Sequence, residues 1–316
     1  MNLNARALAL VEGLATRSEE CRVTLVNRPE VEGRVIDCGV QTRGGLRAGL
    51  DLARVCMANL AEVTIVPGEV AERPCPYVQV TTDHPVLACL ASQYAGWQLS
   101  EGKFFALGSG PMRAVHGREP IFDAIGYRET ASSVVGVLEG RTLPPLEIIK
   151  IIAEGCGVAT KDVTLLIAPT ASLAGGVQVV ARSVETALHK LAELGFDLLR
   201  VVSAHGIAPL PPVAKDDLAA IGRTNDAILY GARVILSVTG DDDSLLDVGH
   251  CVPSSSSNDY GEPFASIFAR YHHDFYAVDK NLFSPAEVMF QNLDTGRVHL
   301  FGQPAPDIVA RSFFGL

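Results

Sequence analysis

Residues 163–195 have the sequence VTLLIAPTASLAGGVQVVARSVETALHKLAELG, and this stretch contains the signals that decide the fold class. The opening run, residues 163–168, is largely apolar and is followed by Pro169, as expected of a buried strand. In residues 172–194, apolar side chains recur at spacings of three or four, and Gly195 follows as a helix stop. A buried strand followed by an amphipathic helix predicts mixed α and β structure.

A second stripe of the predicted helix carries polar side chains at the same spacing: Gln178, Arg182, Glu185 and His189. Arg182 and Glu185 are three residues apart, close enough to interact, and as an exposed pair they would contribute about 0.2–0.5 kcal/mol. Residue spacing alone favours that structural interpretation. In a cleft, the guanidinium would instead hold the carboxylate ionised and aligned, so that it could take a proton from water.

The segments on either side extend the mixture of strands and helices. Strands are expected at residues 23–27, 34–40, 62–66, 78–82, 103–107, 200–202 and 227–238, with a break near Gly231, and in a hairpin formed by 288–293 and 297–301. Helices are expected at residues 7–14, 46–60, 86–94, 143–156 and 216–221. The fold class predicted is therefore α/β to α+β.

Length and composition limit the kind of protein further. A chain of 316 residues exceeds the size at which one hydrophobic core usually stops growing, so two subdomains are expected. A net charge of −10 leaves no basic field for a phosphate backbone, which argues against nucleic acid as the main partner. No apolar run approaches the roughly 18 residues that cross a bilayer, and the N-terminus shows no export signal. We expect a cytoplasmic protein with a small-molecule ligand.

The seven cysteines are an odd number, widely spaced, and contain no Cys-x-x-Cys pair. This pattern indicates neither a disulfide framework nor a zinc cluster. We expect most of them to be small buried hydrophobic side chains.

Two short polar segments follow predicted strands and are candidate ligand sites. Asp83 and His84 come at the carboxyl end of a strand, where α/β proteins commonly bind ligands, although a turn in which Asp83 caps the next helix is the commoner arrangement. Gly108, Ser109 and Gly110 could turn backbone N–H groups toward an anion, or could form an ordinary tight turn. Neither segment predicts a metal site or a nucleoside triphosphate loop.

Residues 254–261, SSSSNDYG, are rich in hydroxyl groups and end in turn-forming residues. A flexible solvated loop is the default interpretation. If the loop is ordered at a cleft, Ser255, Ser256 and Asn258 could hydrogen-bond a polar heterocycle. His205 is similarly ambiguous, since a lone histidine is more often structural than functional.

Taken together, these segments resemble the methenyltetrahydromethanopterin cyclohydrolase family. The resemblance rests on motifs that occur in order along the chain: VIDCGV at 35–40, QVTTDHPVLACLASQYAGW at 79–97, FALGSGP at 105–111, APTASLAGGVQVVARSVETALHK at 168–190, PLPP at 209–212, TNDAILYG at 224–231 and VPSSSSNDYGEPF at 252–264. Coincidence is improbable for so many long motifs in one order.

The resemblance implies a reaction in which a methenyl-tetrahydromethanopterin cation and water give the N5-formyl derivative, reversibly, without a metal or redox cofactor. It implies that Glu185 activates the water and that Arg182 is its electrostatic partner. Substrate contacts are expected from Asp83, His84, Gly108, Ser109, Gly110, Gln178, His205, Ser255, Ser256 and Asn258. The pathway implied is one-carbon metabolism, either formaldehyde oxidation in methylotrophs or methanogenesis.

The family also implies two subdomains with a large cleft between them, placed here at approximately 1–140 and 141–316 or in noncontiguous segments, and a homo-oligomer, expected to be a trimer. Two other functions stay open. One is a different folate or pterin C–N hydrolase, including a metal-dependent amidohydrolase that uses Asp83, His84 and His205. The other is a non-catalytic pterin carrier in which Arg182 and Glu185 are only a surface pair.

Overall fold

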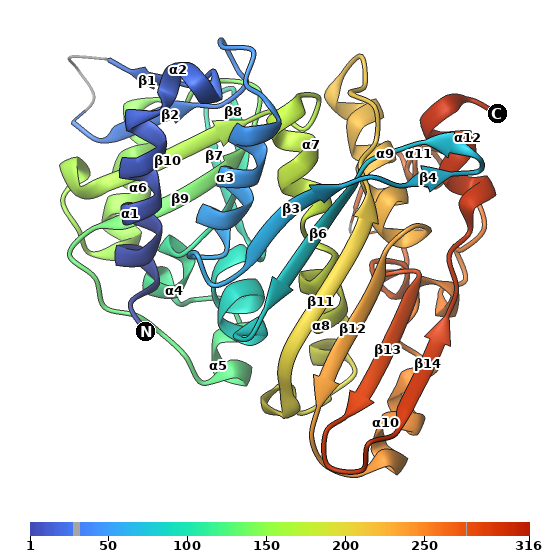
Figure 1. Ribbon diagram of the computed structural model, residues 1–316. Helices are drawn as coiled ribbons and strands as arrows, with labels where there is room; N and C mark the ends of the chain where they lie inside the picture. Colours follow the sequence, from blue (N-terminus) through green and yellow to red (C-terminus); the bar gives the residue numbers. More distant parts are fainter. Residues whose placement is uncertain (28–31, 276) are drawn as a thin grey trace. The chain divides into compact units, whose positions relative to one another are not determined.

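A computed structural model describes residues 1–27, 32–275 and 277–316 of the chain (Figure 1). The contacts divide it into two compact units, each built from two chain segments. Unit 1 is Met1–Ala61 with Leu87–Gln178, and unit 2 is Glu62–Val86 with Val179–Leu316. Both units are noncontiguous, and residue 140 directly follows a central strand of unit 1.

Unit 1 contains a six-stranded mixed sheet. Its strand order is β1 (Thr24–Val26), β2 (Arg34–Asp37), β10 (Val163–Ala168), β9 (Val134–Glu139), β8 (Phe104–Ser109) and β7 (Trp97–Glu101). The central strands β2, β10 and β9 are parallel, and the remaining pairs are antiparallel. The run at residues 163–168 is thus an interior strand of the sheet, as its apolar sequence predicts.

Helices cover both faces of this sheet, which is why its central strands β9 and β10 are apolar along most of their length. On β10, Leu166 packs into the core beneath α1 and α3, whereas Leu165 and Ile167 pack into the core beneath α6. The helical segments of unit 1 are α1 (Leu3–Thr16), α2 (Ser18–Cys21), α3 (Leu46–Cys56), the π-helix η1 (Val86–Gln93), α4 (Met112–His116), α5 (Ile121–Ile125), α6 (Leu146–Cys156), η2 (Thr160–Asp162) and α7 (Leu173–Val180), with η1 and α7 at the unit's ends.

Unit 2 contains a second six-stranded sheet. Its order is β14 (Val298–Gly302), β13 (Glu287–Asn292), β12 (Arg233–Val238), β11 (Val201–Pro209), β6 (Tyr77–Thr82) and β3 (Glu62–Val66). Only β12 and β13 are parallel neighbours. A small hairpin, β4 (Glu69–Val70) and β5 (Arg73–Pro74), joins β3 to β6.

One face of the unit 2 sheet is packed against helices and the other carries exposed side chains. Helices α8 (Ser183–Glu193), α9 (Asp217–Leu229) and α10 (Asp242–Gly249) contact the sheet, and Figure 1 shows α8 behind β11 and β12. On the opposite face, Val298 and Leu300 of β14 are more than half exposed. The remaining helical segments are η3 (Leu198–Arg200), η4 (Ser254–Ser256), α11 (Phe264–Arg270), η5 (Lys280–Leu282) and α12 (Pro306–Phe314).

The predicted fold class is confirmed, and most predicted elements are present, including the hairpin around Asp294-Thr295-Gly296. Two predictions are wrong. The helix expected at 172–194 is two helices, because the backbone at Arg182 leaves helical geometry and its N–H bonds the carbonyl of Val179, only three residues back. The strand expected from residue 227 begins at Arg233, because residues 227–229 are the last turn of α9.

None of the helices in the described part of the chain has the length and apolar character needed to span a bilayer.

Candidate functional site

Arg182 and Glu185 lie at the N-terminus of α8, and both are buried. Arg182 is the residue before the helix, and Glu185 is in its first turn, where the helix dipole favours a carboxylate. Nη1 of Arg182 is 3.9 Å from Oε2 of Glu185, and their side chains are 9% and 6% exposed. The interpretation as a solvent-exposed surface pair is therefore wrong. A carboxylate and a guanidinium in this setting are shielded from bulk water, which strengthens their interaction.

A close approach between α8 and strand β11 fixes the position of the helix. Gly206 of β11 faces α8, and a Cβ atom at this glycine would lie 2.4 Å from Oγ of Ser183 and 2.8 Å from Cγ2 of Val184. Ser183 and Val184 are both fully buried. Glycine at position 206 is thus required by packing, and it brings the first turn of α8, which contains Glu185, directly onto the sheet.

His205 lies on the other side of the sheet. Because successive strand residues point to opposite faces, the side chain of His205 points away from α8 when Gly206 points toward it. Its Nδ1 lies 3.1 Å from Oγ1 of Thr81 on β6. Near the same end of β6, Ser203 donates a hydrogen bond of 2.7 Å to Oδ1 of Asp83. His205 thus contacts β6 from the middle of β11, and the sheet separates it from the Arg182–Glu185 pair.

The turn after β6 differs from the expected helix cap. The Asp83 carboxylate accepts from Ser203, and the hydroxyl of Thr82 closes the turn by accepting a 3.0 Å hydrogen bond from the N–H of His84. Asp83 and His84 are both exposed. Across the described residues, no three His, Cys, Asp or Glu side chains come together in an arrangement that could hold a metal ion.

In unit 1, Ser109 and Gln178 are brought together around Cys56, and Gly110 follows Ser109 in the turn. Oγ of Ser109 donates to the carbonyl of Val137 and lies 3.1 Å from Sγ of Cys56, while Nε2 of Gln178 donates to the same sulfur at 3.8 Å. Gly110 has φ +91°, and its N–H donates to the carbonyl oxygen of Ser92 at 2.8 Å. Since that N–H is used within the protein, the turn after Gly108 is not a ready anion cradle.

The serine-rich segment at 254–261 is held by defined hydrogen bonds. Ser254 is buried and donates to the carbonyl of Leu229, and Ser256 donates to the carbonyl of Cys251. Ser257 donates to Oδ2 of Asp279 at 2.7 Å. Three of the four hydroxyls thus organise the segment itself, which leaves the exposed Ser255 and the Asn258 side chain as its surface groups.

Helix α9 holds the far end of the same segment. Tyr230, just after the helix, donates to the carbonyl of Glu262 at 2.6 Å and accepts from the N–H of Gly261 at 3.2 Å. Oδ1 of Asp226 accepts from the N–H of Phe264 at 2.7 Å. Burial raises the pKa of Asp226 to about 7, against the lowering effect of hydrogen bonds from Ser312 and Phe264. These bonds join the motif at 224–231 to the motif at 252–264.

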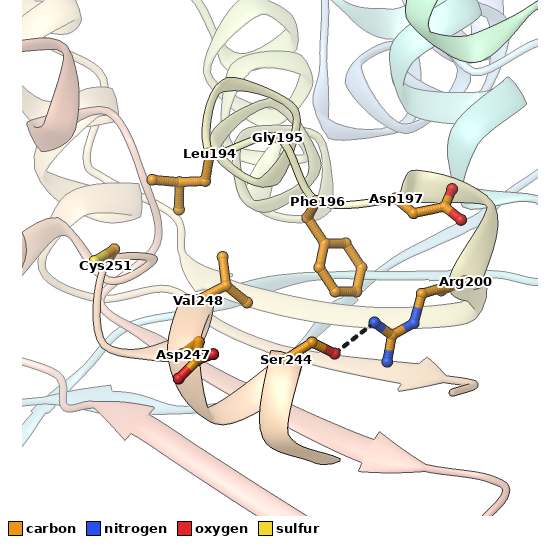
Figure 2. A pocket seen from close by; sticks show the side chains of 9 residues that line it. All are labelled: Leu194, Gly195, Phe196, Asp197, Arg200, Ser244, Asp247, Val248 and Cys251. Atoms are coloured by element: carbon orange, nitrogen blue, oxygen red, sulfur yellow. Dashed lines mark hydrogen bonds between the residues drawn. The ribbon is translucent and has the colours of Figure 1, made fainter. Parts of the chain in front are cut away.

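Figure 2 shows a pocket of about 470 Å³ in unit 2, beyond the C-terminal end of α8. Its lining is Leu194, Gly195, Phe196, Asp197, Arg200, Ser244, Asp247, Val248 and Cys251. Arg200 donates to Oγ of Ser244 at 2.7 Å and to the carbonyl of Thr239 at 2.6 Å, so its guanidinium is engaged by the fold. None of the candidate site residues lines this pocket, and it is not the candidate active site.

The residues that support the candidate site residues carry no signal in the sequence. Six of the seven cysteines are buried, as expected, but the expectation of a plain hydrophobic role overlooks the contacts of Cys56 with Ser109 and Gln178. Asp279 lies outside every motif, and its contact with Ser257 joins residues 22 apart in the chain. Only tertiary structure brings such groups together.

Comparison with known proteins agrees with the motifs. The model of the family described as "Cyclohydrolase (MCH)" matches residues 2–313. A protein named methenyltetrahydromethanopterin cyclohydrolase from Rhodopirellula baltica is 50% identical over 285 residues, covering 89% of this chain and 86% of its own. Proteins of the same name from Methylobacterium sp. (strain 4-46) and Methanospirillum hungatei are 47% and 39% identical, with 99% of this chain covered in both and 97% and 99% of theirs.

The match covers nearly the whole chain and includes the buried Arg182–Glu185 pair and the segments that surround it. The chain belongs to the methenyltetrahydromethanopterin cyclohydrolase family.

Proposed function

We propose that the protein hydrolyses a 5,10-methenyl-tetrahydromethanopterin cation to the 5-formyl derivative, reversibly, in one-carbon metabolism. Family membership over residues 2–313 supports the reaction class, and relatives of this name occur in Methylobacterium and in Methanospirillum. The structural observation that carries the proposal is the burial of Glu185 beside Arg182 at the start of α8. A base shielded from bulk water can act on one bound water molecule.

The chemistry needs an oriented water more than a Lewis acid. The methenyl carbon lies between two ring nitrogens and shares their positive charge, so it is already electrophilic. In the proposed mechanism, the water oxygen bonds to this carbon while Glu185 accepts a proton from the water. The bond from carbon to one nitrogen then breaks, and that nitrogen takes the proton from Glu185. The hydroxyl proton leaves as the formyl carbonyl forms, so one proton is released per turnover.

Arg182 is proposed to align the carboxylate of Glu185 for this proton transfer. Its Nη1 lies 3.9 Å from Oε2, near enough for a strong electrostatic interaction in a buried site. We propose that the reaction uses neither a metal ion nor a redox cofactor, because both the electrophile and the base are supplied by substrate and protein.

The proposed substrate contacts fall into two groups. Asp83, His84, Ser255, Ser256 and Asn258 have exposed or partly exposed side chains that can meet a polar heterocycle directly. His205 lies on the face of the sheet opposite to α8, so it is not proposed to contact the ring on which Glu185 acts. Ser109 and Gln178 are buried, 2% and 3% exposed, and their proposed role is to support the turn at Gly108 and Gly110.

We further propose that the chain forms a homo-oligomer, as a trimer. The uncovered face of the unit 2 sheet supports this proposal, since Val298 and Leu300 expose apolar surface there. Light scattering of the purified protein measures the mass. A monomer at micromolar concentration would contradict the proposal.

The test of the function mixes the purified protein with methenyl-tetrahydromethanopterin and follows the loss of the conjugated cation's absorbance, with the folate analogue in parallel. Hydrolysis of the methanopterin compound, unchanged by a chelator, is the expected result. Preference for the folate analogue would indicate another C–N hydrolase. Loss of activity on chelation would indicate a metal-dependent enzyme, and binding without hydrolysis would indicate a carrier.

A further inference from the structure

Lys190, on the last turns of α8, is a buried lysine. It is 1% exposed and is among the largest fully buried side chains of the described chain. Its Nζ donates to the side-chain oxygen of Asn281 at 2.5 Å and lies 3.5 Å from the carbonyl oxygen of the same residue. Lysine is almost never fully buried unless its ammonium has a partner, so this contact needs an explanation.

Packing alone does not explain a lysine at this position. Burial lowers the pKa of Lys190 although the negative charges of Glu193 and Asp279 act to raise it, so the surroundings disfavour the charged form. An apolar side chain of similar volume, such as methionine, would fill the same space without that cost. The feature that methionine lacks is a directed hydrogen bond to Asn281.

The partner of Lys190 belongs to a short chain of contacts that ends at the serine-rich loop. The N–H of Asn281 donates to Oδ1 of Asp279 at 3.0 Å. Oδ2 of Asp279 accepts from Oγ of Ser257 at 2.7 Å and from the N–H of Asn258 at 3.1 Å. The carboxylate of Asp279 therefore joins Asn281, which Lys190 contacts, to Ser257 and Asn258 of the loop.

Asp259 provides a second connection between Asp279 and the loop at 254–261. The N–H of Asp279 donates to Oδ2 of Asp259 at 3.0 Å, and the N–H of Asp259 donates to Oγ of Ser257 at 3.1 Å. Although burial alone would raise the pKa of Asp279, the hydrogen bonds from Ser257, Asn281 and Asn258 lower it, with a smaller contribution from Lys190. Asp279 is thus an ionised acceptor for these three donors, and Lys190 donates a hydrogen bond to one of them, Asn281.

We infer that Lys190 is a positioning residue for the proposed reaction: through Asn281 and Asp279 it ties the loop at 254–261 to the helix that carries Glu185. This inference rests on the proposed function, because the loop supplies the proposed substrate contacts Ser255 and Asn258. The base at one end of α8 and the loop anchored near its other end then keep a fixed separation. Loss of the anchor loosens the substrate contacts but leaves the base in place.

The test compares Lys190→Met with Lys150→Met, a matched control at an exposed lysine on α6. For Lys190→Met we expect KM to rise about tenfold, the size of one lost hydrogen bond to a charged group, with kcat changed less than about threefold. The control keeps both constants. An unchanged KM in Lys190→Met, or a loss confined to kcat, contradicts the inference. A wild-type protein without hydrolytic activity contradicts the proposed function instead.

Two further measurements separate positioning from general stability. Asn281→Leu removes the acceptor, so the double variant Lys190→Met with Asn281→Leu should raise KM no more than either single variant. If the effects of the two substitutions on KM multiply in the double variant, the two residues act independently, and the inference is overturned.

Hydrogen exchange without substrate provides a second readout: in Lys190→Met, the N–H of Asn258 should exchange faster while the strands of unit 2 keep their protection. Equal protection of Asn258 in both proteins would also overturn it.

Discussion

Burial determines what Glu185 can do. On an exposed helix face, a carboxylate three residues from an arginine is a weak ion pair that salt and water screen. With side-chain exposures of 9% and 6%, Arg182 and Glu185 are removed from most of that screening. The geometry of the guanidinium then matters as well as its charge, because a planar fork fixes direction where an ammonium does not.

Arg182→Lys tests this dependence on geometry. The substitution keeps the positive charge but removes the planar fork, so we expect kcat to fall by about tenfold or more, as for other losses of alignment at a reacting group. The pH dependence of the rate should shift as well, because the lysine cannot hold Glu185 in the same environment. Steady-state kinetics over a range of pH measure both effects. An unchanged pH-rate profile would count against the coupling of Arg182 to Glu185.

Gly206→Ala tests the close approach that positions α8. The new methyl group would meet Ser183 and Val184 at distances that force a shift, so we expect a loss of about 1–3 kcal/mol in the free energy of unfolding, as for other overpacked sites, together with lower activity. Urea denaturation measures the stability. Gly13→Ala on α1 is the control, since nothing lies within 4 Å of its Cβ position, and it should be neutral or stabilising. Equal stability of the two variants would contradict the packing argument.

At the scale of elements, the N-terminus of α10 is joined to the β13–β14 hairpin by one carboxylate. Oδ1 of Asp242 accepts from Asn292 at 2.8 Å and from Thr295 at 3.1 Å, and it lies 2.9 Å from Nε2 of His299. Oδ2 accepts from Arg297 at 3.2 Å. These hydrogen bonds, that of His299 foremost, lower the pKa of Asp242 to about 2 although burial opposes them.

A carboxyl group whose pKa is lower in the folded state stabilises the fold above its unfolded pKa, and the stabilisation is lost as pH falls toward the folded value. For Asp242 that window runs from its ordinary 3.8 down to about 2. We expect Asp242→Asn to lower Tm at pH 7, with a difference from wild type that shrinks across this window. Asp243→Asn, an exposed neighbour on the same helix turn, is the control. A constant difference in Tm from pH 7 to pH 2 would argue against the carboxylate.

Apolar periodicity predicts a helix or strand well where turn residues mark its ends. It predicts less well where the same apolar spacing continues from one element into the next. The helix expected at 143–156 ends at Cys156, as Gly157 indicates, but it begins at Leu146, directly after the two prolines rather than before them. The break at Arg182 carries no such signal, because the apolar spacing of three and four continues through it. Likewise, the apolar residues 227–229 fit a strand or a buried helical turn equally, and in the structure they form the last turn of α9.

At the scale of the molecule, the length of the chain predicts two subdomains, but it does not predict which segments form each of them. Unit 2 takes residues 62–86 from the N-terminal half, because β3 and β6 pair with each other and β6 pairs with β11, more than a hundred residues later. Strand pairing at such separation leaves no local signal. The cleft expected between the subdomains stays a prediction.

The candidate site, too, can be predicted from the sequence only in part. Glu185 and Arg182 could be selected from their motif, and their burial agrees with a role in chemistry. The anchoring of the serine-rich loop by Asp279 and Lys190 could not, since neither residue belongs to the loop and each is recognised only by its contacts. Spacing identifies candidate groups, whereas the network that holds them depends on the fold.

Turnover of methenyl-tetrahydromethanopterin by the wild-type protein and by Glu185→Gln tests whether Glu185 is the base that activates water. The amide keeps the size of the side chain but cannot accept the water proton, so we predict that kcat falls by roughly two to four orders of magnitude, while folding and substrate binding are retained. A Glu185→Gln protein that folds, binds the pterin and hydrolyses it at a rate near that of the wild type would show that Glu185 is not the base.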